Sequence, residues 1–494
     1  MKLSLLLPSP LLSFANDAAD VARVFFGSLE MLIGIPGGDT VIEAEETVEN
    51  GIRTVTVRCG GHTASHTAPV CGDALEDKRF HKRQLKLGVY DCMKAITGRT
   101  PPWGSLTGIR PTRLMYMALE RGLSPAEAGE EMKTLFDVSD EKVRLLRDIL
   151  TVQERVSRPA EDEVDIYIGI PFCTTRCAYC SFLSGEVGKG RQLEPYTEAL
   201  EMETEGVIRL IAEKGLRPRA FYMGGGTPTA LPLPLLERVL KKAKPLYEHC
   251  GEITVEAGRP DTIDRDKLAL LRDQGVTRIS INPQTMHDET LRLIGRAHTR
   301  KQTEDAYALA RSLRFHHINM DLIAGLPGED LDMFEQTLAW SRSLAPESLT
   351  VHSLSIKHSS LLHLWEAKLP DGEMAAQMVR AGEREARERG MLPYYLYRQK
   401  YMAGNLENVG YALPDHACVY NIDMMEETGN IIALGAGGIS KRLFPPRGHI
   451  ERAPNVSDVC HYIARADEMA ERKRALWEKT PAPKEGAEND RDSE

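Results

Sequence analysis

The sequence lacks a surplus of positive charge and any long apolar run. Its 494 residues include 62 lysines and arginines against 72 aspartates and glutamates, which gives a formal net charge of −10. Nucleic-acid binders are usually basic because they neutralise phosphates, so this balance argues against general nucleic-acid binding. No stretch approaches the roughly 20 apolar residues that cross a bilayer, so we expect no membrane association.

Cysteines in a disulfide pattern are also missing. Six of the nine cysteines are scattered without metal-like spacing, namely Cys59, Cys71, Cys92, Cys250, Cys418 and Cys460. This usage indicates a reducing compartment, so we expect a cytoplasmic protein. The apolar start resembles a signal peptide, but it is short, is broken by Pro8 and Pro10 and has only Lys2 before it. We expect a buried first strand there instead.

The length of the chain suffices for several domains. Residues 1–155 predict an N-terminal α+β domain, with a strand near Leu3–Leu7 and an alternating apolar segment at Thr54–Arg58. Helical patterns follow at residues 76–97, 111–121, 125–135 and 139–157.

A regular alternation of strands and helices begins at Val164. Short apolar strands are expected at residues 164–170, 220–223, 252–257, 278–282, 317–323 and 349–354. Amphipathic helices lie between them, for example at residues 194–213, 234–247 and 330–344. This alternation implies a parallel sheet with right-handed crossovers. We therefore predict an α/β fold, a partial (β/α)6 TIM-like barrel over residues 160–370, with its functional site at the C-terminal ends of the strands.

The remaining part of the chain is predicted as a C-terminal α/β extension over residues 371–478, which covers the substrate. Helical patterns open and close it, at residues 372–390 and 456–476. Residues 479–494 lack apolar side chains and are predicted to be a disordered tail.

Three further cysteines, Cys173, Cys177 and Cys180, form a C-x3-C-x2-C motif directly after the first barrel strand. Three soft thiolates on one loop suit an iron–sulfur cluster. A structural zinc ion takes four ligands, and no fourth cysteine or histidine lies close by in the sequence. A 4Fe–4S cluster held by three cysteines keeps one iron free of protein, and that iron can bind a second molecule.

Candidate binding residues lie at the ends of the next strands. Gly225, Gly226 and Thr227 belong to a glycine run after the second strand, where backbone can approach a ligand closely and donate N–H groups. A bland turn is the alternative. Glu256 ends the third strand and is either a ligand contact or a solvated carboxylate.

The fourth and fifth strands add three polar candidates. Gln284 suits hydrogen bonding to hydroxyl groups, and Arg296 suits pairing with a carboxylate. Asp321 is a carboxylate inside an apolar run, so it requires a partner.

These motifs resemble the radical S-adenosylmethionine (SAM) superfamily and, within it, the oxygen-independent coproporphyrinogen III oxidase family. The segments that carry the resemblance are Ile170–Cys173, Cys177–Cys180, Leu106–Thr112, Arg278–Gln284, Tyr394–Lys400 and Gly404–Tyr411. The last four narrow it to the coproporphyrinogen dehydrogenase branch.

The resemblance implies a 4Fe–4S cluster on Cys173, Cys177 and Cys180, with SAM bound beside it. It also implies a set of SAM contacts, which comprises Tyr167, Tyr179, Gly225, Gly226, Thr227, Glu256, Gln284, Arg296, Asp321 and Ile439. For Tyr167 and Tyr179, core packing is an equal alternative. Ile439 lies in a glycine run that by itself is a weak dinucleotide-loop signal and that lines the adenine in the family.

Two further groups of residues keep two interpretations each. Tyr394, Tyr395 and Tyr397, next to Arg398 and Lys400, suit either a porphyrin-like ring or a packed cluster.

The second group is Arg110 and Arg113, which suit either a carboxylate or a solvated helix start.

The activity that the resemblance implies is radical decarboxylation of coproporphyrinogen III propionates to vinyl groups, giving protoporphyrinogen IX. It also implies an external one-electron donor such as flavodoxin or ferredoxin. Phe182 stands where well-characterised relatives carry a fourth cysteine, and Gly169 where they carry histidine. A heme chaperone, or an enzyme acting on another tetrapyrrole, therefore stays open as an alternative.

Overall fold

The computed structural model describes residues 1–27, 29–108, 110–180, 185–355, 370–399, 402–444 and 449–480. These residues form two compact units. Unit 1 comprises Met1–Arg155, Ile323–Leu338 and Thr350–Tyr411, and unit 2 comprises Val156–Leu322, Ala339–Leu349 and Ala412–Glu494. The domain bounds expected from the sequence separate regions by their functional role. A division into compact units does not test such roles, so these bounds stay a prediction. The predicted tail lies outside the described residues from residue 481 onward.

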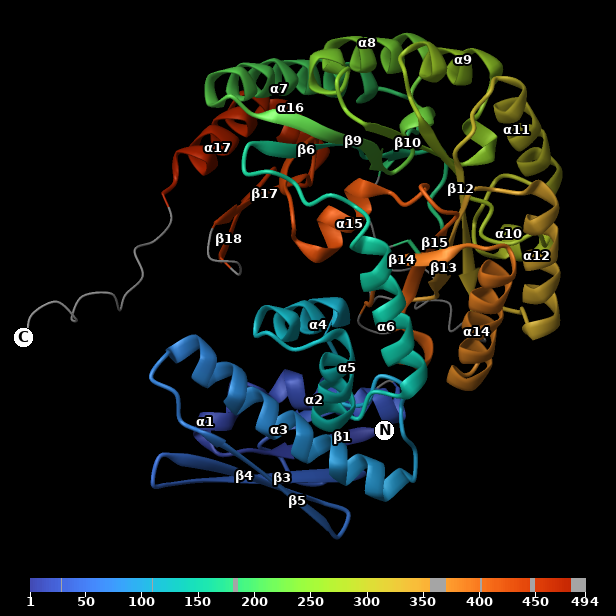
Figure 1. Cartoon of the computed structure of the whole chain (residues 1–494). Coiled ribbons are helices and arrows are strands. Elements are labelled where there is room, and N and C mark those ends of the chain that lie inside the picture. The colour runs from blue at the N-terminus through green and yellow to red at the C-terminus, as the bar shows by residue number, and fades with distance from the viewer. Residues whose placement is uncertain are drawn as a thin grey trace, which may run out of the picture. The chain divides into compact units, whose positions relative to one another are not determined.

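Unit 1 contains a five-stranded sheet with the order β2-β1-β3-β4-β5 (Figure 1). Its strands are β1 (Lys2–Leu6), β2 (Glu30–Ile33), β3 (Thr40–Glu49), β4 (Ile52–Cys59) and β5 (His62–Pro69). Helices α2 (Ala15–Phe26) and α3 (Ala74–Thr97) pack against it and bury alternate strand residues such as Leu3, Leu5, Val55 and Val57. The predicted first strand is confirmed as β1, and the alternating segment at Thr54–Arg58 lies within β4, whereas α2, β2, β3 and β5 were not predicted.

The predicted helices of the N-terminal region are confirmed as α3, α4 (Pro111–Glu120), α5 (Pro125–Phe136) and α6 (Asp140–Gln153). Unit 1 also contains α14 (Gly372–Glu388) and β14 (Leu392–Tyr397). A buried carboxylate, Glu407, accepts hydrogen bonds from Trp103 Nε1 and Lys142 Nζ, both at 2.6 Å. The pairing compensates the burial of both charges within unit 1.

The larger sheet has the order β14-β15-β13-β12-β11-β10-β9-β6-β16-β17-β18, in which β15 spans Asn408–Ala412. All six predicted barrel strands are confirmed in consecutive order, as β6 (Glu163–Ile170), β9 (Arg217–Gly225), β10 (Glu252–Gly258), β11 (Arg278–Ile281), β12 (Ile318–Ala324) and β13 (Ser348–Ser353). The pairs from β6 to β12 are parallel, so the C-terminal ends of these strands lie at one edge.

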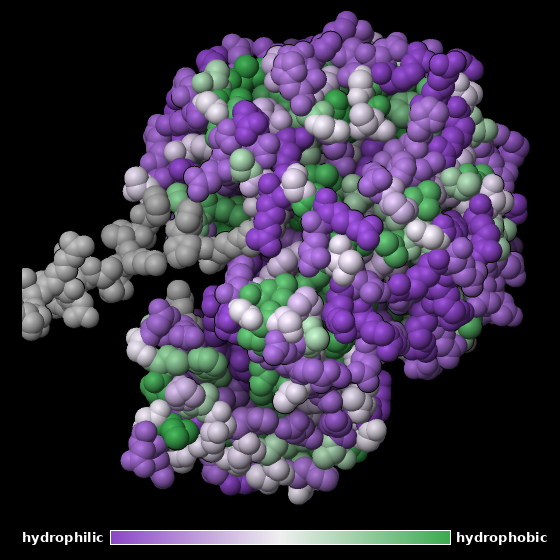
Figure 2. Space-filling view, viewed as in Figure 1, coloured by the Kyte–Doolittle hydropathy of each residue, from purple (hydrophilic) through white to green (hydrophobic). Residues whose placement is uncertain are grey.

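Helices cover the outer face of the unit 2 strands (Figure 1). They include α7 (Leu193–Lys214), α8 (Leu233–Ala243), α9 (Arg265–Asp273) and α11 (Arg300–Ser312). Helix α8 buries Leu236, Val239 and Leu240, which recur at helical spacing on one side. Figure 2 shows the surface over these helices as mainly hydrophilic, as expected for helices whose apolar sides face the sheet. No helix of the described residues is long and apolar enough to cross a membrane.

Unit 2 also extends the sheet beyond β6. Strand β16 (Asn430–Leu434) pairs in parallel with β6, and β17 (Ile439–Phe444) and β18 (His449–Pro454) follow as antiparallel strands. The single helix predicted at residues 456–476 is wrong: α16 (Val459–Ala464) and α17 (Ala466–Glu478) are separated at Arg465, whose φ of −133° is not helical. This break lets Tyr462 and Lys473 reach the same buried carboxylate.

That carboxylate is Glu203 of α7, which is fully buried. It accepts hydrogen bonds from Lys473 Nζ (2.5 Å), Tyr462 OH (2.6 Å), Asn455 Nδ2 (2.8 Å) and the Gly435 N–H (2.8 Å). Lys473 is fully buried as well. A buried charge without a partner is costly, so these two residues stabilise unit 2 only as a pair.

Replacing Glu203 with alanine leaves the Lys473 ammonium buried without its counter-charge. We expect E203A to lower the free energy of unfolding by about 3–5 kcal/mol, measured by urea denaturation. The matched control is Glu205→Ala, which breaks exposed ion pairs with Arg209 and Lys242 on the same helix. The control should cost about 0.5 kcal/mol or less, and equal losses in the two variants would contradict the role of Glu203.

A pair of buried aspartates, Asp165 and Asp423, lies near the start of β6. Asp165 is 1% exposed, and neither of its carboxylate oxygens meets an N–H or hydroxyl donor in the described part of the chain. Burial raises the pKa of Asp165 well above its ordinary value, and the charge of Asp423 adds to this. Thr428 Oγ1 donates to Asp423 at 2.6 Å, and Arg219 Nε lies 3.3 Å from it. Burial raises the pKa of Asp423 as well, but the Thr428 hydrogen bond and the Arg219 charge oppose that shift, so Asp165 is the member of the pair that holds a proton more readily.

The pH dependence of stability tests this assignment. The unfolded chain releases the Asp165 proton near about pH 4, whereas the folded chain retains it. The stabilising contribution is therefore complete below about pH 4 and is lost as the pH rises through the raised pKa. We expect Asp165→Asn to gain stability over the native chain in this window, by up to about 1.4 kcal/mol per pH unit.

Urea midpoints at several pH values measure this difference. The same substitution at Asp266, which is exposed on α9, is the matched control. A difference between D165N and the native chain that does not change with pH would rule out a proton held by Asp165.

Candidate functional site

The cysteine motif lies on the loop between β6 and α7. The side chains of Cys173, Cys177 and Cys180 are all of intermediate exposure. The loop is held to a second segment, because the Ala178 N–H donates to Ile294 O at 2.9 Å and Thr175 Oγ1 donates to Gly295 O at 3.0 Å. Phe182, which replaces the fourth cysteine of relatives, lies outside the described residues.

The donor set of this loop fits a cluster better than a single ion. No three histidine, cysteine or carboxylate side chains of the described residues converge as a site for one metal ion. A 4Fe–4S cluster is larger, and its thiolates surround it instead of meeting at one point. Three accessible thiols within one short loop at the C-terminal end of a barrel strand provide such a donor set.

The glycine run at the end of β9 packs directly against the entry of this loop. A Cβ on Gly226 would lie 2.6 Å from Phe172 O, so no larger residue fits there. The Gly226 N–H donates to Ile170 O and the Thr227 N–H to Phe172 O, both at 2.8 Å. These two N–H groups therefore already have protein partners. Thr227 Oγ1 lies 3.6 Å from Cys173 Sγ, next to the candidate cluster site.

Glu256 contacts a half-buried group of tyrosines that the sequence analysis found only in part. Tyr222 OH donates to Glu256 Oε1 at 2.5 Å. The rings of Tyr167, Tyr222 and Tyr420 stack on one another, with centroid distances of 6.3 Å, 4.6 Å and 6.0 Å. Burial raises the pKa of Tyr222, and the Glu256 charge adds to this, so its phenol stays protonated as a donor. The alternation along β9 could have identified Tyr222, whereas Tyr420 lies too far away in sequence.

Gln284 and Asp321 are brought together after β11. The Gln284 N–H donates to Asp321 O at 3.0 Å, and Gln284 has a positive φ of 70°, which is unusual for a residue with a side chain. Gln284 Oε1 is buried and accepts no hydrogen bond from the described residues. A buried acceptor in a strained residue fits a ligand hydroxyl. Asp321 Oδ1 accepts from Asn319 Nδ2 at 2.8 Å, so the partner expected for Asp321 exists.

Arg296 and Tyr179 contact each other beside the cysteines. Arg296 Nη2 donates to Tyr179 OH at 3.0 Å, and Arg296 Nη1 donates to Asn282 O at 3.1 Å. Burial raises the pKa of Tyr179, while the Arg296 charge opposes this shift. The arrangement presents a guanidinium next to the motif, where it suits a ligand carboxylate.

Ile439 follows a tight turn at the end of β16. Gly435 has a φ of 91°, and a Cβ there would lie 2.3 Å from Gly169 O. Tyr196 OH donates to the same Gly169 carbonyl at 2.6 Å. Ile439 is 45% exposed, which leaves an apolar side chain available to a flat ring. The turn thus lies beside the strand that leads into the cysteine loop.

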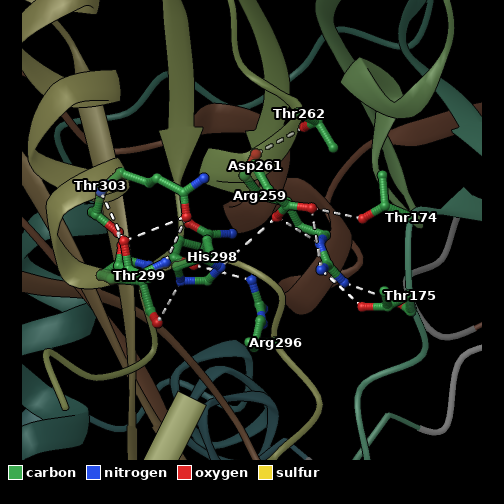
Figure 3. A network of polar contacts seen from close by, with 12 residues as sticks. Thr174, Thr175, Arg259, Asp261, Thr262, Arg296, His298, Thr299 and Thr303 are labelled. Carbon is green, nitrogen blue, oxygen red and sulfur yellow. Dashed lines mark hydrogen bonds and ion pairs between the residues drawn. The ribbon is translucent and has the colours of Figure 1, made fainter. Parts of the chain in front are cut away.

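A polar network that the sequence analysis found only at Arg296 contacts the loop through Thr174 and Thr175 (Figure 3). Arg259 donates to Thr175, and Asp261 accepts from Thr174 Oγ1 at 2.8 Å. His298 Nδ1 lies 3.8 Å from Asp261 Oδ1. In the sequence, this network corresponds to the Gly-Arg-Pro-Asp run at the end of β10. Its role could not be predicted, because it depends on contacts with the distant cysteine loop.

The aromatic run in unit 1 has a structural role. Tyr394 and Tyr395 are buried and contact each other at 4.8 Å between ring centroids. Arg398 is 2% exposed, donates to Leu106 O at 2.8 Å and stacks on Trp103. These contacts support the packed-cluster interpretation, while Lys400 lies outside the described residues.

For Arg113 as well, the structure shows a contact within the protein. Arg113 Nη1 lies 3.7 Å from Glu120 Oε1, and its side chain is 22% exposed. It therefore already faces a carboxylate of its own helix.

Comparison with known proteins agrees with this geometry. Residues 167–341 match the family model described as the radical SAM superfamily. The chain is 38% identical over 479 residues to the oxygen-independent coproporphyrinogen-III oxidase-like protein HemZ of Bacillus subtilis, which covers 93% of this chain and 96% of that protein. It is 34% identical over 223 residues to the heme chaperone HemW of the same organism, which covers 43% of this chain and 57% of HemW.

A solved structure supports the fold. Coproporphyrinogen III oxidase (HemN) from Escherichia coli, described as a radical SAM enzyme, superposes with a TM-score of 0.51 at 22% identity and covers 68% of this chain and 74% of that chain. The parallel strands, the cysteine loop at their C-terminal edge and the near-full-length match to HemZ lead to one assignment. The chain belongs to the radical SAM superfamily and, within it, to the oxygen-independent coproporphyrinogen-III oxidase-like family.

Proposed function

We propose that this protein decarboxylates two propionate side chains of coproporphyrinogen III to vinyl groups and so forms protoporphyrinogen IX. The observation that carries the proposal is the match over 93% of the chain to a coproporphyrinogen-III oxidase-like relative, joined to a three-cysteine loop at the edge where a barrel carries its site. The superfamily uses a 4Fe–4S cluster and SAM. The substrate is the part of the proposal that rests on likeness alone.

The cysteine loop and its surroundings would hold the two cofactors. Cys173, Cys177 and Cys180 supply three thiolates to the cluster, whose remaining iron is open to SAM. The Arg296 guanidinium, placed by Tyr179, suits the SAM carboxylate. When both are bound, the reduced cluster and SAM would supply the radical chemistry that removes a hydrogen atom from substrate.

The other side chains would orient the nucleoside part of SAM. The buried Gln284 Oε1 accepts from a ribose hydroxyl, and Asp321, held by Asn319, accepts from a second. Glu256, fixed by the Tyr222 phenol, accepts from the SAM amino group. Ile439, whose side chain is 45% exposed, packs against the adenine ring.

The chemistry also requires partners that this site does not contain. Each propionate loses one hydrogen atom to the radical, one carbon dioxide and one electron to an acceptor. A small electron carrier such as flavodoxin or ferredoxin supplies the electron that reduces the cluster. The substrate is an acidic tetrapyrrole, so cationic groups are needed where its propionates bind.

A second function is favoured by one specific observation. The HemW relative, at 34% identity, is a heme chaperone, and it shares part of this chain's length. On this reading the same fold would bind and deliver heme without decarboxylation. A radical SAM enzyme acting on another tetrapyrrole is a third reading.

One assay separates these functions. Anaerobically reconstituted protein is given SAM, a one-electron reductant and coproporphyrinogen III. We expect carbon dioxide, protoporphyrinogen IX and 5′-deoxyadenosine, measured by chromatography and mass spectrometry. SAM cleavage without decarboxylation would refute the coproporphyrinogen assignment and favour another tetrapyrrole. Stoichiometric heme binding without turnover would favour the chaperone.

The cluster assignment is tested by removing one thiol. Replacing Cys177 with alanine leaves two ligands, so we expect the loss of most bound iron and of detectable SAM cleavage, measured by iron analysis and 5′-deoxyadenosine release. The matched control is Cys460→Ala, which removes an exposed free thiol elsewhere in unit 2. Native iron content in C177A would refute the assignment, whereas equal losses in both variants would indicate nonspecific damage instead of ligand loss.

A further inference from the structure

We propose that Arg259, acting with Asp261, is a positioning residue that holds the cysteine loop and sets the reduction potential of its cluster. The inference deepens the proposed function and rests on its assignment of a cluster to Cys173, Cys177 and Cys180. It concerns Arg259 and Asp261, which are not among the residues assigned to SAM.

Arg259 donates two hydrogen bonds to the middle of the cysteine loop. It follows β10 directly and is 3% exposed. Its Nη1 donates to Thr175 O and its Nη2 donates to Thr175 Oγ1, both at 2.9 Å (Figure 3). Thr175 Oγ1 in turn donates to Gly295 O at 3.0 Å. A planar guanidinium fixes two oxygens of one residue at once, so it restrains the loop midway between Cys173 and Cys177.

The same guanidinium lies against a candidate cluster ligand. Arg259 Nη1 is 3.8 Å from Cys177 Sγ, within hydrogen-bonding distance of a sulfur acceptor. Hydrogen bonds to ligating sulfurs and nearby charge are among the factors that set cluster potentials. A reduced cluster carries one more negative charge than an oxidised one. A buried cation beside Cys177 therefore favours the reduced form and raises the potential.

Asp261 balances this positive charge. Its Oδ1 accepts from Arg259 Nε at 3.1 Å, and its Oδ2 accepts from Thr174 Oγ1 at 2.8 Å. The neighbouring His298 adds no positive charge, because burial lowers its pKa to about 3. Asp261 thus has two effects: it holds the start of the loop through Thr174, and it offsets the charge of Arg259.

The opposite charges of the pair predict opposite changes in potential. Removing the Arg259 charge favours the oxidised cluster, while removing the Asp261 charge leaves Arg259 unopposed and favours the reduced cluster. A purely mechanical role in holding the loop gives both variants the same direction of change. The sign of the shift therefore separates electrostatic tuning from loop support.

The experiment is a redox titration of the reconstituted protein, followed by electron paramagnetic resonance of the reduced cluster. We expect Arg259→Met to shift the one-electron equilibrium about tenfold toward the oxidised form, which is about 59 mV lower in midpoint potential. Asp261→Asn, which preserves shape and can still accept from Thr174, should shift it in the opposite direction. Arg259→Lys keeps the charge without the planar fork, so its shift should be smaller than that of R259M.

The matched control is Arg278→Met. Arg278 is also a buried arginine of the barrel, but it starts β11 at the opposite end of the strands and bonds to His416 O. Its loss should lower stability and leave the potential unchanged.

The outcomes distinguish the inference from the function on which it rests. Native midpoints in R259M and D261N, or shifts of the same sign, overturn the role of the pair. If R259M does not fold, R259K and D261N still decide the sign and the size. A native chain that assembles no cluster overturns the proposed function itself, and the inference with it.

Discussion

The burial of Glu203 is the interaction on which the organisation of unit 2 depends. One carboxylate of α7 receives a lysine from α17, a phenol from α16, an amide from the segment after β18 and the N–H of Gly435. Because the buried Glu203 carboxylate is not hydrated, its charge is stabilised only when these partners are all present. They fix the Gly435 turn beside Gly169, on the strand that enters the cysteine loop, so a structural ion pair determines the geometry of the candidate cofactor site.

The site itself follows the logic of parallel strands. Side chains from successive strand ends meet at one edge, and the cysteine loop lies there because it continues β6. What makes this edge specific is a set of restraints around the loop. Ile294 and Gly295 hold it through backbone carbonyls, Gly226 packs under its entry and Arg259 grips Thr175. The thiols are therefore presented by a loop whose backbone is already bound to three other segments.

Local signals were sufficient to predict most of this architecture. The six barrel strands and the cysteine motif were predictable because apolar runs, helical spacing and close cysteine spacing are properties of contiguous residues. The interruption at Arg465 was not, since its cause is the distant Glu203, which Tyr462 and Lys473 both have to reach. Arg259 and Tyr420 were missed for the same reason, because each acquires meaning only from residues far away in sequence.

The parallel pairing of β16 with β6 has a consequence for the order of synthesis. A ribosome that has reached residue 300 has already passed all three motif cysteines, yet β16, which is one of the two strands that border β6, and Lys473, which neutralises Glu203, have not been made. The cysteines are thus synthesised before β16 and Lys473. A chain that ends before β16 would therefore carry the three thiols without that strand and without the Glu203–Lys473 ion pair.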